Sequence, residues 1–525
     1  MRCRARHAGG ASALILALAV AQPWAQGAGE PVDYDAIYRI KDEGFERSQV
    51  METLGYLTDI HGPRLTNSPN FVKAAEWAMA RLAGWGVANV RREAWGPFGR
   101  GWSNEKFTAN VVSPQPFPLI AFTKAWAPGT NGVVTGEATL AIVQRDEDFT
   151  AFAGRLRGKI VLAVSPPAVE PLFAPTARRF TDEDLAGMET QRVGAAGRGG
   201  RNVAVLQAFA RRRMEFFAKE GVLAVLEPGT GRNDHGAILV GGPRELRDPK
   251  AAPQPPQIVV ASEHYGRIAR TLDRKIPVTV ELHVQNRYHD ASLDTFNIVG
   301  ELPGTDKADE VVMLGAHFDS WHAGTGATDN AAGSAATMEA MRILKAARVT
   351  MRRTVRLALW SGEEQGLLGA RAYAKQQFAD PDTMRLLPGH TSLSAYFNMD
   401  NGTGAIRGVY LQGNEAVRPI FGAWMAPFRS LGMTTLTIRS TGSTDHVAFD
   451  EVGLPGFQFI QDPVEYNSHS HHTNMDLYER IQPEDMMKNA VIIASFVYHA
   501  ANRDERLPRK PLPKPRTPVP ATTSQ

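Results

Sequence analysis

The feature that most constrains this chain is a regular alternation of strand-like and helix-like segments between Asn297 and about Ala501. Short runs rich in Val, Leu, Ile and Phe are followed by segments with apolar residues at helical spacing, a pattern typical of β–α repeats. We expect strands at 310–316, 354–360, 394–399 and 456–460, and helices at 331–345, 366–377 and 483–499. The predicted fold class is α/β, with a mostly parallel central sheet flanked by helices.

The rest of the chain divides by composition. Helices at 50–60 and 71–82 and a strand at 87–94 are expected before prolines 114, 116 and 118, which mark a boundary. Short β-like runs then alternate with Gly- and Pro-rich turns, with a helix expected at 202–219. The predicted domains are a first part of the main domain at 31–119, a β-rich insert at 120–288, the second part at 289–505, and a Pro- and Lys-rich tail at 506–525.

The Arg- and Gly-rich stretch 178–213 within the insert is open to two interpretations. It is either an anion- or partner-binding surface or a solvated loop and helix face.

The N-terminus has the pattern of an export signal. Three arginines within residues 2–6 precede an apolar stretch at 11–21, which ends in the small-x-small triplet Ala-Val-Ala. The stretch is too short to span a bilayer as a helix, which needs about 20 residues. We predict a cleaved signal peptide at 1–21, with an uncleaved anchor as the alternative, and a periplasmic or secreted protein without stable membrane insertion.

Charge and cysteine content exclude several classes of function. The formal net charge is +3, but the basic excess lies at the two ends, and the body between them is slightly acidic. A nucleic-acid-binding groove across the fold is therefore not expected. The single cysteine, Cys3, excludes an intramolecular disulfide, a Cys-based zinc site and a thiol nucleophile in the body. Neither a Gly-x-Ser-x-Gly elbow nor a His-Glu-x-x-His motif occurs, which argues against a serine hydrolase and a single-zinc helix metalloprotease.

Chemistry-bearing side chains follow four successive predicted strands. In open α/β sheets such groups collect beyond the carboxyl ends of the strands. The segments concerned are HFD at 317–319, SGEE at 361–364, Asp400, and the His-rich stretch 469–472. Asp329 lies in the turn before the helix expected at 331–345. So many converging ionisable groups would be unstable without a cation, and a pair of divalent metal ions removes the problem. Mixed His and carboxylate ligands suit zinc. Adjacent Glu363 and Glu364 can divide the duties of general base and ligand.

The ordered motifs AHFDSW, GATDNAAG, LWSGEEQGLLGA, FNMDNG, STDHVAF and HHTNMD closely resemble the co-catalytic dizinc aminopeptidase and glutamate carboxypeptidase superfamily. The stretches SQVMETLGYLTDIHGPRLTNSPNF and REAWGPFGRGW look like its carboxypeptidase Q (plasma glutamate carboxypeptidase) branch. In that branch a protease-associated (PA) domain is inserted in the peptidase domain. The resemblance covers roughly residues 35–500 and implies that 120–288 is a PA-like insert.

The resemblance implies ligands for two zinc ions per protomer: His317 and Asp400 for one ion, Glu364 and His472 for the other, and Asp329 as the bridge. The last ligand is assigned to His472, rather than to His469 or His471, because the family's final histidine precedes a threonine.

The resemblance also implies roles beyond metal binding. Glu363 would be the general base toward a metal-bound water, and Asp319 would orient the ring of His317. Some relatives carry a tyrosine immediately before the last histidine, where this chain has His471. The candidates for the oxyanion donor are therefore His471 and Tyr466. The pair Asp445 and His446 matches a recurring motif near the pocket, with a purely structural role as the alternative.

These expectations describe an exported dizinc metallo-exopeptidase that hydrolyses peptide bonds at the end of short peptides or dipeptides. Two alternatives stay open, a single-zinc acyl transferase resembling glutaminyl cyclases and a receptor-like binding domain that has lost catalysis. Recognition of either the free amino or the free carboxy terminus is compatible with the motifs, and a homodimer is expected from the resemblance only.

Overall fold

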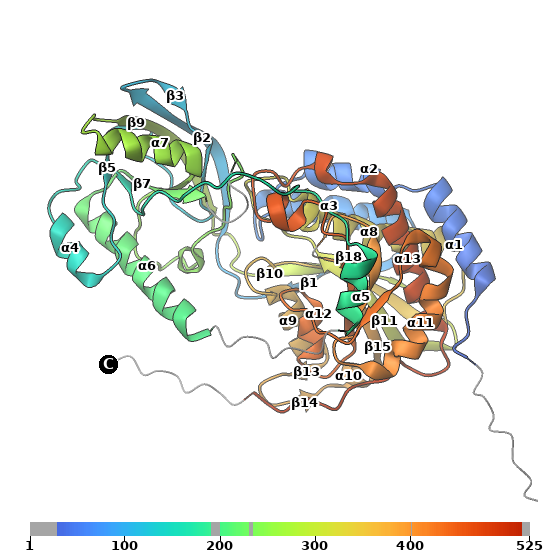
Figure 1. Cartoon of the computed structure of the whole chain (residues 1–525). Coiled ribbons are helices and arrows are strands. Elements are labelled where there is room, and N and C mark those ends of the chain that lie inside the picture. Colours follow the sequence, from blue (N-terminus) through green and yellow to red (C-terminus); the bar gives the residue numbers. More distant parts are fainter. Residues whose placement is uncertain (1–28, 191–199, 230–234, 401, 517–525) are drawn as a thin grey trace, which may run out of the picture.

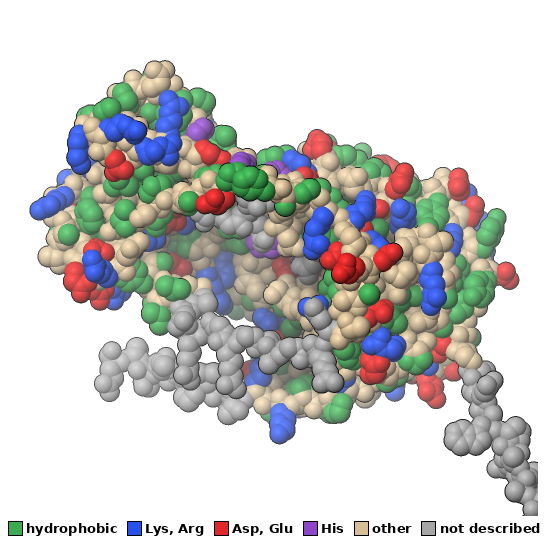
Figure 2. Space-filling view, viewed as in Figure 1, with side chains coloured by type: hydrophobic (Ala, Val, Ile, Leu, Met, Phe, Trp, Pro, Cys, Tyr) green, Lys and Arg blue, Asp and Glu red, His purple; other side chains and the backbone are tan. Residues whose placement is uncertain are grey.

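The computed structural model describes residues 29–190, 200–229, 235–400 and 402–516, and the expected signal peptide lies outside these ranges. Figure 1 shows two lobes side by side, each built around one of two eight-stranded sheets. The space-filling view shows a hollow between them (Figure 2). Each lobe has its own apolar core, so the chain folds as two layered units joined at their inner faces.

The sheet of the main lobe is mixed. In spatial order its strands are β1 (Ala88–Trp95), β10 (Thr295–Leu302), β12 (Arg353–Trp360), β11 (Lys307–His317), β15 (Leu393–Asn398), β18 (Gly456–Gln461), β16 (Ile406–Tyr410) and β17 (Thr435–Thr437). The central strands β12, β11, β15 and β18 run parallel, whereas β10 and β16 pair antiparallel with their central neighbours. The four parallel strands are those expected from the sequence, and their carboxyl ends share one edge.

Helices cover both faces of this sheet. The largest core cluster joins it to α1 (Tyr34–Glu46), α2 (Val50–Gly55), α3 (Pro69–Gly84), α8 (Ala332–Ala346) and α13 (Pro483–Asn502). In a second core cluster of the same sheet, α9 (Leu368–Gln377) and α12 (His446–Asp450) pack against Trp360 and Tyr396. The rings of Tyr396 and Phe449 stack there at 4.2 Å. Side chains along nearly all of α13 are buried, which explains its continuous apolar sequence.

The second lobe begins earlier than expected. In spatial order its strands are β3 (Phe117–Pro118), β2 (Gly101–Ser113), β9 (Thr279–His289), β5 (Val133–Leu140), β6 (Ile160–Leu162), β7 (Ala224–Gly229), β8 (Gln257–Ala261) and β4 (Ala121–Thr123). Strand β2 pairs with β9 from Gly101 opposite His289 to Ser113 opposite Thr279. The prolines from 114 onward therefore end a strand inside this lobe, and the expected boundary near residue 120 is displaced to about residue 101.

A strap formed by residues 165–190 leaves the second lobe and lies along the main lobe, where α5 (Asp182–Thr190) packs beside β17 (Figure 1). Arg179 on the strap contacts Asp462 at 3.0 Å and Asp485 at 2.7 Å. Both carboxylates belong to the main lobe, and their side chains are only 2% and 4% exposed. The strap thus fixes the second lobe to the main lobe through buried charge.

The start of the C-terminal tail is extended and packed against the main lobe. Leu507 is buried, and Arg509 donates hydrogen bonds to the carbonyl oxygens of His390 and Leu393 at 2.8 and 2.6 Å. Within the described ranges, no helix combines the length and apolar character needed to cross a bilayer.

Candidate metal centre

The carboxyl edge of the four parallel strands gathers the predicted side chains. His317 is the last residue of β11, the pair Glu363–Glu364 follows β12, and Asp400 follows β15. Asp329 comes from the short helical turn η3 (Ala327–Ala331) before α8. His472 belongs to the loop after β18, just beyond the turn η6 (Tyr466–Ser470). Residues far apart in the sequence meet here because parallel strands end at the same edge.

The first group of ligand atoms lies around His317. Its Nε2 is 3.1 Å from Oδ1 of Asp329 and 3.6 Å from Oδ1 of Asp400. All three side chains are buried, and their ligand atoms lie within 4.8 Å of one another. This spacing is that of a cation-binding site with one nitrogen and two carboxylate oxygens.

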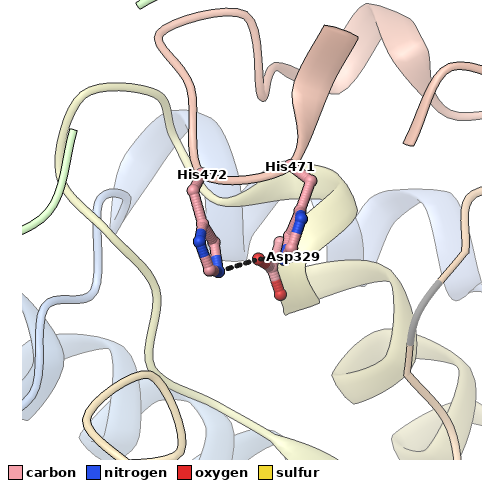
Figure 3. Close-up of side chains that lie close together, drawn as sticks. All are labelled: Asp329, His471 and His472. Atoms are coloured by element: carbon pink, nitrogen blue, oxygen red, sulfur yellow. Dashed lines mark ion pairs between the residues drawn. The ribbon is translucent and has the colours of Figure 1, made fainter. Parts of the chain in front are cut away.

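The second group shares Asp329 with the first. Nε2 of His472 is 3.1 Å from Oδ2 of Asp329 and 2.9 Å from Oε2 of Glu364. Figure 3 shows His471 and His472 pointing from one loop toward Asp329, and Nε2 of His471 is 3.5 Å from the same Oδ2. One oxygen of Asp329 therefore faces His317 and the other faces the histidine pair.

Oε1 of Glu364 is buried and has no hydrogen-bond partner among the described residues, and the imidazoles that face Oδ2 of Asp329 make no well-aligned hydrogen bond with it. Burial and the neighbouring Asp329 raise the pKa of Glu364 to about 7. Burial opposes protonation of His317, but the carboxylates of Glu363 and Asp400 outweigh it and raise the pKa of that imidazole. The raised pKa values show that this cluster favours bound positive charge. Its nitrogen and carboxylate ligand atoms fit divalent cations, which would take the place of the protons.

Asp319 lies beside Nδ1 of His317. Nδ1 of His317 donates to the backbone carbonyl of Asp319 at 3.0 Å, while the carboxylate oxygen Oδ1 is 3.6 Å away. The carboxylate instead accepts from the Thr66 hydroxyl at 2.7 Å and from the backbone N–H of Glu363 at 3.3 Å. Asp319 therefore orients His317 mainly through its main chain, and its carboxylate fixes the segment that carries Glu363.

Two further residues behind the cluster were missed in the sequence. The guanidinium of Arg64 is completely buried and donates to carbonyl oxygens of Leu57, Phe318, Thr325 and Gly326 at 2.8–3.0 Å. Asp476 accepts from the backbone N–H groups of Thr328 and Asp329. Both lie inside stretches that mark the resemblance, GPRLTN and HHTNMD, and an arginine between apolar residues was the available signal.

The candidate substrate-contacting residues divide into two sets. The rings of Tyr466 and His471 stack at 4.6 Å, with Tyr466 buried and His471 partly exposed beside the cluster. Asp445 and His446 are completely buried, and Nε2 of His446 lies 2.7 Å from Nε2 of Gln412. Burial lowers the pKa of His446 to about 4. The structure thus brings His471 to the open side of the cluster and leaves Asp445 and His446 beneath it.

Comparisons with known proteins agree with this arrangement. Residues 297–497 match the family model described as peptidase family M28. Carboxypeptidase Q of Rattus norvegicus is 26% identical over 477 residues, which are 90% of each chain. A peptidase M28 precursor from Shewanella amazonensis has a similar fold, with a TM-score of 0.65 and 24% identity over 91% of this chain and 98% of that one. A zinc aminopeptidase from Bacillus subtilis has a TM-score of 0.56 and 17% identity over 87% and 95% of the two chains.

The fold, the His–carboxylate cluster and these likenesses define a zinc-dependent exopeptidase, an enzyme that acts on peptides. The match to peptidase family M28 covers residues 297–497, the part of the chain that carries this cluster.

Proposed function

We propose that this enzyme is an exported exopeptidase with two zinc ions, which hydrolyses the terminal peptide bond of short peptides or dipeptides. The observation that carries the proposal is the position of Asp329. Its Oδ1 faces His317 at 3.1 Å and its Oδ2 faces His472 at 3.1 Å, so one carboxylate joins two groups of ligand atoms. Paired metal ions about 3.5–4 Å apart need such a bridge.

Each ion would have one histidine, one carboxylate and the shared aspartate. One ion would be held by His317 and Asp400, the other by His472 and Glu364, and both by Asp329. The short contacts within each group and the unpaired Oε1 of Glu364 support this division. When bound, zinc supplies a Lewis acid for the scissile carbonyl and lowers the pKa of water.

Glu363 is proposed as the general base, which accepts a proton from the attacking water and returns it to the leaving nitrogen. It adjoins the proposed ligand Glu364, and its carboxylate lies close enough to His317 to raise the pKa of that imidazole, which supports a position beside the proposed ions. The hydrogen bond from its backbone N–H to Oδ1 of Asp319 fixes the segment that carries it. A base held in this way lowers the barrier of proton transfer without any movement of the main chain.

His471 is the better supported oxyanion donor. Its imidazole is partly exposed beside Asp329, whereas Tyr466 lies buried under the ring of His471. A donor on the open side of the cluster can contact the developing negative charge on the substrate. Tyr466 then serves as the surface against which His471 stacks.

The decisive experiment measures bound zinc and hydrolysis of a dipeptide panel for the wild type and for Glu363→Gln. We expect two zinc ions per chain in both proteins and a loss of about 100-fold or more in kcat for the variant. Glu147→Gln, an exposed change on α4 (Asp146–Phe152) of the second lobe, is the matched control and keeps both. One zinc with cyclisation of an N-terminal glutaminyl peptide, or zinc binding without any hydrolysis, would contradict the proposal.

Export through residues 1–21, the PA-like nature of the second lobe and a homodimer are parts of the same proposal. The sequence pattern of the N-terminus supports export. Full-length expression followed by N-terminal sequencing of the mature protein tests the first part, since a chain that begins at Met1 in the final compartment would contradict cleavage.

A further inference from the structure

A cavity of about 870 Å³ lies in the second lobe, beside α6 (Gly200–Glu220), β7 and the segment 239–245. Its charged lining residues are Lys124, Arg211, Arg213, Arg244, Glu227 and Glu245. Positive side chains therefore outnumber negative ones. Figure 2 shows Lys or Arg and His side chains on the inner surface of the hollow between the lobes.

Of the two acidic residues of the cavity, Glu227 is paired with two of the cations, whereas Glu245 contacts only a neutral amide. Oε1 of Glu227 is 3.0 Å from Arg213, and its Oε2 contacts Lys124. Oε1 of Glu245 accepts from the side-chain amide of Gln254 at 3.5 Å.

By contrast, the exposed guanidinium groups of Arg211 and Arg244 have no carboxylate partner among the described residues. Excess positive charge in a partly enclosed cavity favours an anion, and guanidinium groups bind carboxylates in bidentate fashion.

One wall of this cavity adjoins the metal centre. Leu239 lines the cavity and forms a β-bridge with Thr473, and the neighbouring Val240 donates its N–H to the carbonyl of His472 at 3.0 Å. Gly241 also lines the cavity and lies against Trp321, whose ring is 6.2 Å from that of His472. Segment 239–241 therefore lines the cavity on one side and contacts the loop that carries His472 on the other.

We infer that the cavity is an exosite for a carboxylate of the peptide substrate, remote from the scissile bond and held by Arg211 and Arg244. The inference rests on the proposed function, because it names acidic peptides as the preferred substrates of the same centre. It also favours the anion-binding interpretation of the basic stretch 178–213, since Arg211 and Arg213 of that stretch line the cavity.

The neighbouring Arg212 provides a matched control. It lies on the same helix but contacts Asp146 and packs over the rings of Phe149 and Phe209 at 5.6 and 5.4 Å, and it does not line the cavity. Arg212→Gln therefore removes one positive charge from α6 without changing the cavity.

The test measures binding of two dansyl-labelled hexapeptides, Ala-Ala-Glu-Glu-Ala-Ala and Ala-Ala-Gln-Gln-Ala-Ala, to zinc-loaded protein carrying Glu363→Gln. We expect the acidic probe to bind roughly tenfold more tightly at low salt, with most of this advantage lost in high salt. The double variant Arg211→Gln/Arg244→Gln removes the advantage, and Arg212→Gln keeps it. Melting temperatures equal to that of the protein carrying Glu363→Gln alone show that the further variants fold.

The outcomes separate this inference from the proposed function. Equal binding of the two probes, or an unchanged advantage in the double variant, overturns the inference even where the wild type hydrolyses the glutamine peptide. An enzyme that hydrolyses neither these peptides without the label nor any member of the dipeptide panel overturns the proposed function, and with it the assignment of the bound peptide as substrate. A preference for the acidic peptide in kcat/KM that disappears in the double variant supports both.

Discussion

Replacement of Arg64 by methionine is predicted to destabilise the enzyme and to weaken zinc binding. The guanidinium has no solvent exposure and donates to four backbone carbonyls at 2.8–3.0 Å. Methionine fills a similar volume but donates no hydrogen bond. The carbonyl of Gly326 keeps the N–H of Ala331, so at most three buried acceptors are left unpaired, at a cost of about 1 kcal/mol each, ~3 kcal/mol together. The variant also no longer buries a guanidinium charge, and this gain offsets part of the loss in stability. Three of the carbonyls lie in the segment between His317 and Asp329, so its loosening raises the zinc dissociation constant roughly ten- to hundredfold.

Urea unfolding of the zinc-free protein measures the stability change, and competition with a chelator measures zinc affinity. Arg64→Lys should lie between the wild type and Arg64→Met, because an ammonium has three donors and cannot reach all four carbonyls. Arg287→Met, which alters a mostly exposed side chain 3.7 Å from Glu105, should cost less than about 0.5 kcal/mol. A loss below about 1 kcal/mol for Arg64→Met, or unchanged zinc affinity, would refute the reasoning.

Three further predictions follow from other contacts. Asp329→Asn should reduce bound zinc from the proposed two ions per chain to one or none by elemental analysis, and two retained ions would exclude the bridging role. Asn474→Ala removes the amide oxygen that accepts from the backbone N–H of Ile238 at 2.6 Å, so zinc should dissociate several-fold faster, as a chelator would detect. Burial opposes ionisation of Glu43, but Arg47 and Arg342 outweigh it and hold its pKa below 4.5. The ionised carboxylate therefore stabilises the fold at neutral pH, and this stabilisation is lost as pH falls below 4.5. Glu43→Gln should lower the free energy of unfolding in urea by about 3 kcal/mol at pH 7 and make it depend less on pH in the acid range. The same pH dependence in the variant and the wild type would contradict the assignment.

The parallel core of the main lobe was predictable because its signals are local. Each central strand is a short apolar run, and each is followed directly by a polar group that must lie at the sheet edge. The cluster around Asp329 therefore follows from the sequence together with one topological rule. Strands β16 and β17 were not predicted, since both are short and lie between loops and helices of mixed composition.

The supporting contacts of the centre depend on long-range pairing and were not predictable. Arg64 meets carbonyls more than 250 residues away in the sequence, and no local pattern encodes backbone acceptors. The role of Asp319 depends on which of its oxygens faces His317. The main-chain and carboxylate oxygens lie 3.0 and 3.6 Å from Nδ1, a difference of only 0.6 Å, which the spacing of residues in the sequence cannot specify. The boundary at residue 101 likewise depends on the pairing of β2 with β9, more than 160 residues away in the sequence.

The strap at residues 165–190 has a consequence for how this enzyme can be divided. Its Arg179 faces two almost fully buried carboxylates, Asp462 and Asp485, across the gap between the lobes. A shortened enzyme without the second lobe would leave Asp485 with only Lys488, at 3.6 Å, and Asp462 with only Arg407 as ion-pair partners among the described residues. Although the second lobe is continuous in sequence, we therefore expect its removal to destabilise the main lobe unless the two aspartates are changed as well.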